Sequence, residues 1–192
     1  RVFVLQYMTS WQKLVSDQYV LAVLATCRDS DPQVRELSIA LLERLPLEGS
    51  LARYADSRTQ QFRTALTGAE SRSVLLAAKH LLDSESDSKA VAGALARIVV
   101  KPASSEQRME ALNLIAVMGP HAVSVASQVS AILLEPTDGQ EIQLNFGDVF
   151  GGVAVAASWL GPFRSDRKST WQFVAAVALA RMGKEAAAEL SK

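Results

Sequence analysis

A helical phrase recurs along this chain at a nearly fixed interval, and this recurrence constrains the fold more than any other feature. The phrase occupies residues 34–46, 108–120 and 171–183, where small and apolar side chains stand at helical spacing before a closing Gly or Pro. When the three copies are aligned on their last large apolar residue, one column holds only small side chains, namely Ser38, Ala111 and Ala175. A weaker copy places Leu75 in this column, so the steps between positions 38, 75, 111 and 175 are 37, 36 and 64 residues. The last step equals one repeat plus an insertion of roughly 28 residues, and such a period is typical of stacked helical repeats.

This periodicity predicts an all-α fold, a right-handed α-solenoid of about five antiparallel helix pairs. One pair cannot bury its apolar face alone, so successive pairs stack and share a continuous core. We expect a single domain over 1–192, with repeats at 2–28, 31–67, 70–101, 104–136 and 166–192 and one irregular insertion at 137–165. Composition agrees, because 49% of the residues are hydrophobic but only 6% are aromatic.

Capping residues and breaks give the expected helix boundaries. Asp31 can cap a helix that starts at Pro32, a position where proline's missing N–H costs nothing. Ser104 and Gln107 fit a capping box for a helix at 105–118. The other expected helices are 2–15, 18–28, 51–66, 70–83, 87–100, 121–135 and a last pair from about residue 166.

These residues resemble the HEAT-repeat family, specifically its short bacterial repeats. The family pattern has an Asp-Pro or similar cap, then Val-Arg, a small residue, leucines, and a closing Gly or Pro turn. It is matched by Asp31, Pro32, Val34, Arg35, Leu41 and Leu42, by Ala111, Leu114, Ile115, Gly119 and Pro120, and by Ala175, Leu179 and Gly183. The resemblance covers residues 30–136 and 166–192, although steps of 36 and 37 are shorter than those of longer HEAT units. It implies core roles for the aligned apolar columns and a concave face of second helices that binds a partner.

The repeated arginines have a structural interpretation as well as a functional one. Arg35 and Arg108 occupy the same column, and we expect each to reach a neighbouring unit's carboxylate or helix end, with ligand binding as the alternative. The chain has 20 basic and 20 acidic side chains, and arginines between 35 and 72 exceed nearby acids by about one charge. This balance is too small for a groove that tracks phosphates, so we do not expect nucleic-acid binding.

The search for reactive chemistry is negative. His80 and His121 stand 41 residues apart without metal-ligand spacing, and Cys27 lies alone in an apolar run, where a packed thiol is expected. The glycine-containing stretch 147–152 fits no phosphate-loop pattern. We therefore expect no metal, no cofactor and no enzyme activity.

Two apolar stretches have to be weighed as membrane spans. Residues 111–134 carry no formal charge over 24 positions, but Gly119 and Pro120 interrupt them, which predicts two helices instead of one span. Residues 149–163 are too short. No signal peptide or lipidation motif is visible, which slightly favours the cytoplasm, while the first residue, Arg1, indicates a fragment or a processed form.

The insertion at 137–165 is the candidate binding site. It contains four of the chain's nine Phe and Trp residues, and insertions in repeat proteins often lie on the binding face. One interpretation is a packed plug, in which residues 153–160 cover the core. The other is an apolar rim for a partner, formed by Phe146, Phe150 and Trp159 near Arg164 and Arg167.

The sequence thus predicts a non-catalytic protein-protein interaction scaffold. The alternative is a catalytic HEAT-like domain, similar to bilin lyases or DNA glycosylases, whose site residues have no match here. The expected partner is another protein of unknown identity. Nothing in the residues indicates an oligomeric state.

Overall fold

A computed structural model describes residues 16–134 and 170–190 of the chain. These residues form helices and connecting turns and contain no strand. The elements are α2 (Asp17–Thr26), α3 (Pro32–Arg44), η2 (Gly49–Tyr54), α4 (Ala55–Leu66), α5 (Ser71–Leu81), η3 (Glu85–Asp87), α6 (Ser88–Val100), α7 (Ser105–Met118), η4 (Gly119–Val125), α8 (Ala126–Leu133), α10 (Thr170–Met182) and α11 (Lys184–Leu190). The all-α prediction is confirmed for this part of the chain.

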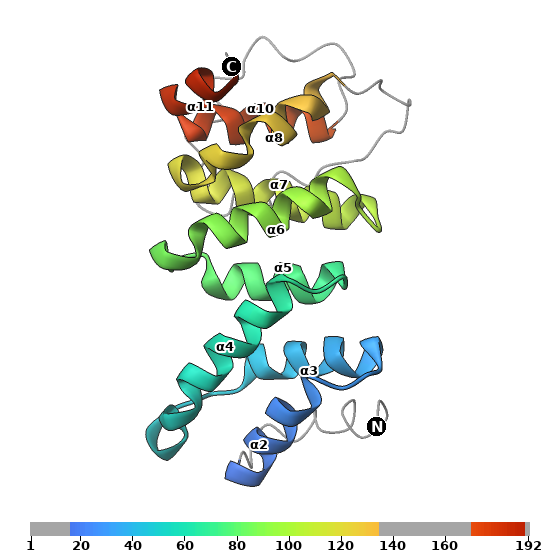
Figure 1. The fold of residues 1–192 in the computed structure, drawn as a ribbon, viewed down its shortest axis with the longest axis vertical. Helices are drawn as coiled ribbons and strands as arrows, with labels where there is room; N and C mark the ends of the chain where they lie inside the picture. Colours follow the sequence, from blue (N-terminus) through green and yellow to red (C-terminus); the bar gives the residue numbers. More distant parts are fainter. Residues whose placement is uncertain (1–15, 135–169, 191–192) are drawn as a thin grey trace.

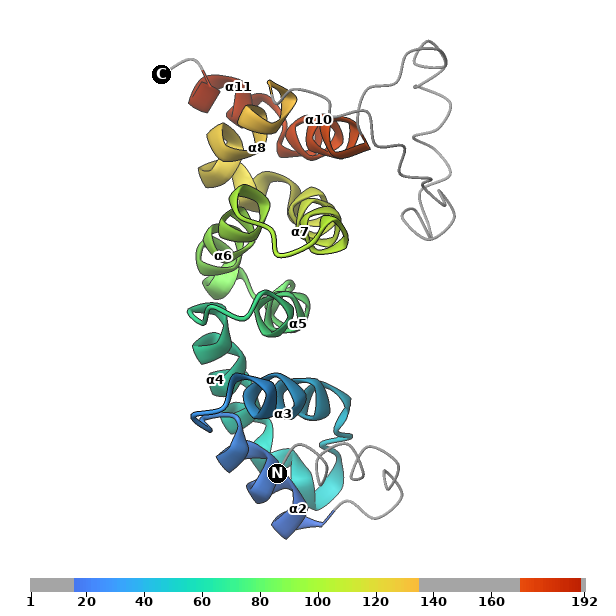
Figure 2. The ribbon, with the colours of Figure 1, turned by 90° about the vertical axis from the view of Figure 1, so that its right-hand side faces the viewer.

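The helices lie in two adjacent columns that follow the sequence (Figures 1 and 2). One column runs through α3, α5, α7 and α10, and each of these helices contacts the next. The other runs through α2, α4, α6, α8 and α11, again with contacts between successive members. We call these the first and the second column. Helices also pack across the columns, for example α4 on α5 and α6 on α7.

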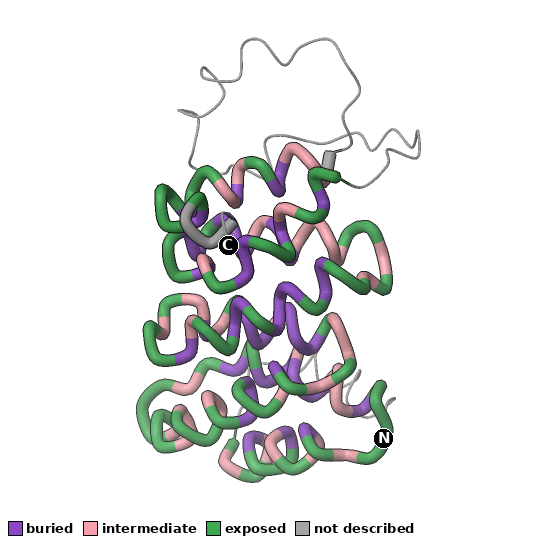
Figure 3. The backbone as a smooth tube through the Cα atoms, turned by 45° about the horizontal axis from the view of Figure 1, so that its top comes forward, coloured by how far each residue is buried: buried purple, intermediate pink, exposed green. Residues whose placement is uncertain are grey.

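The aligned column of small residues lies in the core. Ser38, Ala111 and Ala175 are fully buried, and Leu75 is nearly so. Buried and exposed residues alternate along each helix, so that every helix presents an apolar side to its neighbours (Figure 3). Small side chains at this position let neighbouring helices approach closely, which explains their recurrence.

The predicted caps are present. The Asp31 carboxylate accepts a hydrogen bond from the Gln33 N–H at 2.9 Å, and Pro32 is the first residue of α3. The Ser104 hydroxyl accepts one from the Gln107 N–H at 3.3 Å. The Gln107 Oε1 is buried without a hydrogen-bond partner, so this side chain does not complete a capping box.

Two helices differ from the prediction in how they begin. The expected helices at 51–66 and 121–135 are α-helical only from Ala55 and Ala126, because η2 and η4 precede them. Gly119 has a φ of 54°, and Pro120 has no N–H to donate, so the chain turns tightly after α7 before it can form α-helix.

The stretch Ser105–Leu133 is long and apolar enough to cross a membrane, judged by length and composition alone. Half of its most apolar window is buried inside the protein. The chain turns after α7 through η4 (Figure 1), and α8 then packs on α6, α10 and α11. The described structure therefore contains two helices here, as the sequence predicted.

Candidate functional site

Two adjoining hollows of about 580 and 540 Å³ lie along the exposed side of α6, in the middle of the second column. They share Gly93, Ala94 and Arg97, and we call them together the α6 groove. The end of α4, the turn into α5, and the start of α8 form its walls. The other lining residues are Arg63, Leu66, Thr67, Gly68, Ala69, Ser71, Val74, Asp87, Lys89, Ala90, Ala96, Ile98, Val100, Lys101, Val125 and Gln128.

Small side chains keep the α6 groove open. Gly93 lies in helical conformation, and a Cβ built on it would meet no atom within 4 Å. Ala90 and Ala94 stand on either side of it. Val74, Ile98 and Val125 are buried at the base, so the floor is apolar. A ligand could therefore approach the backbone of α6 closely at Gly93.

The charged residues along the α6 groove are mostly basic. Four basic side chains and one acidic side chain line it, which leaves a net charge of +3. Lys89 and Lys101 take part in no ion pair among the described residues. Arg97 donates through Nη2 to the backbone carbonyl of Leu66, which carries no formal charge. Within the part of the chain that the structure describes, three cationic groups of the groove thus have no anionic partner.

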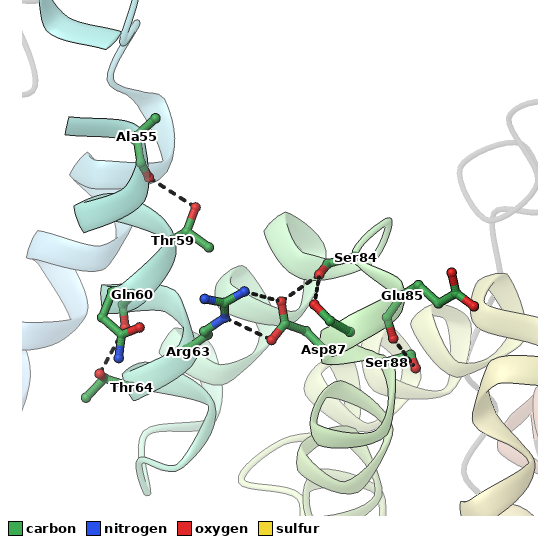
Figure 4. A network of polar contacts seen from close by, with 10 residues as sticks. Ala55, Thr59, Gln60, Arg63, Thr64, Ser84, Glu85, Asp87 and Ser88 are labelled. Atoms are coloured by element: carbon green, nitrogen blue, oxygen red, sulfur yellow. Dashed lines mark hydrogen bonds and ion pairs between the residues drawn. The ribbon is translucent and has the colours of Figure 1, made fainter. Parts of the chain in front are cut away.

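The single acidic residue of the groove is already neutralised (Figure 4). Arg63 donates from Nε to Asp87 Oδ1 at 2.9 Å and from Nη2 to Oδ2 at 3.0 Å. Ser84 donates to the same carboxylate at 2.6 Å. The hydrogen bonds from Arg63 and Ser84 hold the pKa of Asp87 below its usual value, so it stays ionised and paired. This network links α4 to the start of α6.

The repeated arginines have the structural role that the sequence predicted. Arg35 donates to the carbonyls of Asp29 and Ser30 at 2.8 and 2.9 Å and pairs with Glu70. Arg108 donates from Nε to the Val99 carbonyl at 2.9 Å, near the end of α6. Arg108 thus places its cation at the end of α6, where carbonyl oxygens are otherwise unpaired, and Arg35 binds the turn between α2 and α3.

The same column continues in the last helix pair. Gln172 stands where Arg35 and Arg108 stand in their copies, and it donates from Nε2 to the Leu133 carbonyl at 3.2 Å. The repeat alignment therefore matches a recurrent hydrogen bond to the end of the preceding helix.

Two other ionisable side chains, Cys27 and His80, are packed against the protein interior. Cys27 is buried, and burial raises the pKa of its thiol to about 12. The His80 ring packs on Phe62 with 4.2 Å between ring centroids, and burial lowers the pKa of His80. Among residues 16–134 and 170–190, no group of three or more His, Cys, Asp or Glu side chains could hold a metal ion.

The predicted site residues are not among those that the structure describes. Phe146, Phe150, Trp159, Arg164 and Arg167 all fall within 135–169, outside the described residues, so the plug and the rim both stay predictions. The α6 groove itself was not predicted. Its signal in the sequence is a set of exposed residues at steps of four, with Lys89, Gly93 and Arg97 on α6 and Lys101 directly after it.

Comparisons with protein-family models, with curated proteins and with solved structures found no match to this chain.

Proposed function

We propose that this chain is a non-catalytic scaffold that binds another protein, built as a right-handed solenoid of HEAT-like helix pairs. The two columns of helices support the architecture, as do the buried small-residue column and the recurrent hydrogen bonds from Arg35, Arg108 and Gln172. Repeat proteins of this kind typically bind partners along the extended surface that one column of helices presents.

The α6 groove is the observation that carries the proposal. It is open, it has an apolar floor with basic groups around it, and it lies on helices held by a continuous core. A preformed surface of this kind loses little conformational entropy when a partner binds. An open groove with an apolar floor and a basic rim can bind a partner segment without any catalytic group.

Affinity capture tests the proposal. The full chain, immobilised and exposed to lysate of the source organism, should retain a defined protein, and the purified partner should then bind it saturably by calorimetry. Failure of every captured protein to bind in purified form would contradict the scaffold. Excision of a base from alkylated DNA, or a change in the absorption of an added bilin, would instead support the catalytic alternative.

A further inference from the structure

We propose that the α6 groove binds an extended acidic segment of the partner protein, with acidic side chains at relative positions i, i+2 and i+6 and small side chains between them. This inference rests on the proposed function, and it adds the chemistry and the spacing of the bound segment.

The first argument is charge complementarity. Lys89, Arg97 and Lys101 line the groove and form no ion pair among the described residues, while the two carboxylates that lie at the groove itself already have partners. Asp87 is bound by Arg63, and Glu70, at the edge of the groove beside Gly68, is bound by Arg35. The groove therefore presents three cations that have no ion-pair partner among the described residues.

Ion pairs form elsewhere on the surface of the described residues. In the first column Arg72 is 3.3 Å from Glu36 and Lys79 is 2.5 Å from Glu110, and at the second column Arg53 of η2 pairs with Asp17 of α2. Lys89, Arg97 and Lys101 are three cations along one groove without such a pair among the described residues, so an anionic segment is the complementary partner.

The second argument is spacing. Lys89 and Arg97 are eight residues apart on α6, and Lys101, the residue that follows its last one, is four residues after Arg97, which corresponds to about 12 and 6 Å along the helix axis. An extended strand advances about 3.3 Å per residue and points alternate side chains to the same side. Steps of two and four residues therefore span about 7 and 13 Å on one face. This match gives the pattern i, i+2 and i+6.

The third argument concerns the floor of the groove. Gly93 leaves room for close approach of a backbone, and Ala94, Val74 and Val125 offer apolar contact to small side chains. Among the described residues that line the groove there is no aromatic side chain, and three cations are few for a phosphate backbone. A peptide therefore fits better than a single-stranded nucleic acid.

The test uses the full chain and a fluorescent ten-residue peptide with Glu at its second, fourth and eighth positions and Val, Ser and Ala elsewhere. Fluorescence anisotropy should show saturable binding that weakens as NaCl is added. A control peptide of the same composition, with Glu at its second, third and seventh positions, should bind about fivefold more weakly because one carboxylate faces away.

Charge-reversal variants locate the site. Lys89→Glu and Lys101→Glu should each weaken binding about tenfold, whereas Lys184→Glu, in the first turn of α11 and outside the groove, should leave it unchanged. A carboxylate is favourable near the start of a helix and unfavourable near its end. Lys89→Glu should thus raise the melting temperature slightly and Lys101→Glu should lower it, so a shared loss of binding cannot come from unfolding.

Gly93→Leu tests the floor. The new side chain enters open space, so the fold should be retained and helix propensity should improve, while the peptide should lose measurable binding. Equal binding of both peptides, or full binding by Gly93→Leu, overturns the proposal. Preferential binding of a ten-residue oligothymidine, lost in Lys101→Glu, overturns it in favour of nucleic acid.

The partner obtained by affinity capture separates this inference from the scaffold itself. If that partner binds Gly93→Leu and Lys101→Glu as tightly as the unchanged chain, the scaffold stands and the α6 groove is not its site. If neither the peptide nor any purified partner binds, both proposals fail.

Discussion

Substitution by alanine should raise the stability of the folded chain at Gly93 and lower it at Gly119. Gly93→Ala adds a methyl group that meets no atom within 4 Å, on a backbone that is already helical. The added side chain therefore neither clashes nor packs, and only the helix propensity and the entropy of the unfolded chain change. Alanine is favoured over glycine in a helix interior by about 0.8–1 kcal/mol, so the variant should gain that much stability.

Gly119→Ala should lose stability. Gly119 has a φ of 54° and a ψ of −124°, a conformation that side chains with a Cβ rarely adopt, and the new Cβ would lie 3.3 Å from the Arg181 carbonyl oxygen. Backbone strain of this kind costs about 1–3 kcal/mol. The two variants should therefore differ by roughly 2–4 kcal/mol, taking this cost together with the helix propensity gained at Gly93.

Urea unfolding followed by circular dichroism at 222 nm measures both changes, and thermal melting gives a second reading. For a chain of this size, 1 kcal/mol corresponds to a shift of about 2–4 °C in the melting temperature. A loss of stability in Gly93→Ala would show that α6 packs against something at Gly93, and it would remove the open floor of the groove. A stable Gly119→Ala would refute the role of the turn after α7.

Three further predictions concern burial and charge. Ala111→Arg places an unpaired charge in the core and should cost about 3–5 kcal/mol by urea unfolding, whereas Val117→Arg on the same helix, at a site 59% exposed, should cost almost nothing. The Cys27 thiol, with its pKa raised to about 12, should react with iodoacetamide at pH 8 on the order of 10³-fold more slowly in the folded than in the urea-unfolded chain; equal rates would contradict its burial. The pKa of Asp87 is lower in the folded chain than in the unfolded chain, where it is about 3.9. The ionised carboxylate therefore stabilises the fold fully at pH values above about 3.9. This stabilisation is lost as the pH falls from about 3.9 through the lower pKa of the folded state. Asp87→Asn should accordingly melt below the unchanged chain at pH 7, by a margin that shrinks below about pH 4, and a margin independent of pH would refute the ion pair with Arg63.

Much of the helical framework could be predicted because its signals are local. The Asp31–Pro32 start, the Ser104 cap and the glycine turns act within a few residues, and the structure places helix boundaries close to them. The column of small residues was predicted to be buried because a period near 37 puts equivalent positions against the same neighbour. The early starts expected for the helices at 51–66 and 121–135 were wrong, since apolar spacing alone does not distinguish 3₁₀ from α turns.

The α6 groove could not be predicted, because it depends on which charges find partners in space. Arg63 and Arg97 are equivalent in the sequence as exposed helical arginines, yet one is bound to Asp87 and the other only to a carbonyl. The openness at Gly93 likewise depends on how far α4 and α8 stand from α6. The spacing of the basic residues and Gly93 can be read from the sequence, but neither the missing ion pairs nor the open space can.

The recurrent hydrogen bonds to main-chain carbonyls affect which substitutions and duplications such a chain can accept. Their donors are Arg35, Arg108 and Gln172. Each donor binds the main chain of the residues before it, and every amino acid offers the same carbonyl oxygen there. The joint between successive pairs therefore tolerates substitution on its accepting side. A duplicated helix pair would carry its own donor side chain, and the backbone of whichever pair precedes it would supply the accepting carbonyl. Helix pairs could therefore be gained or lost as whole units without a second, compensating mutation.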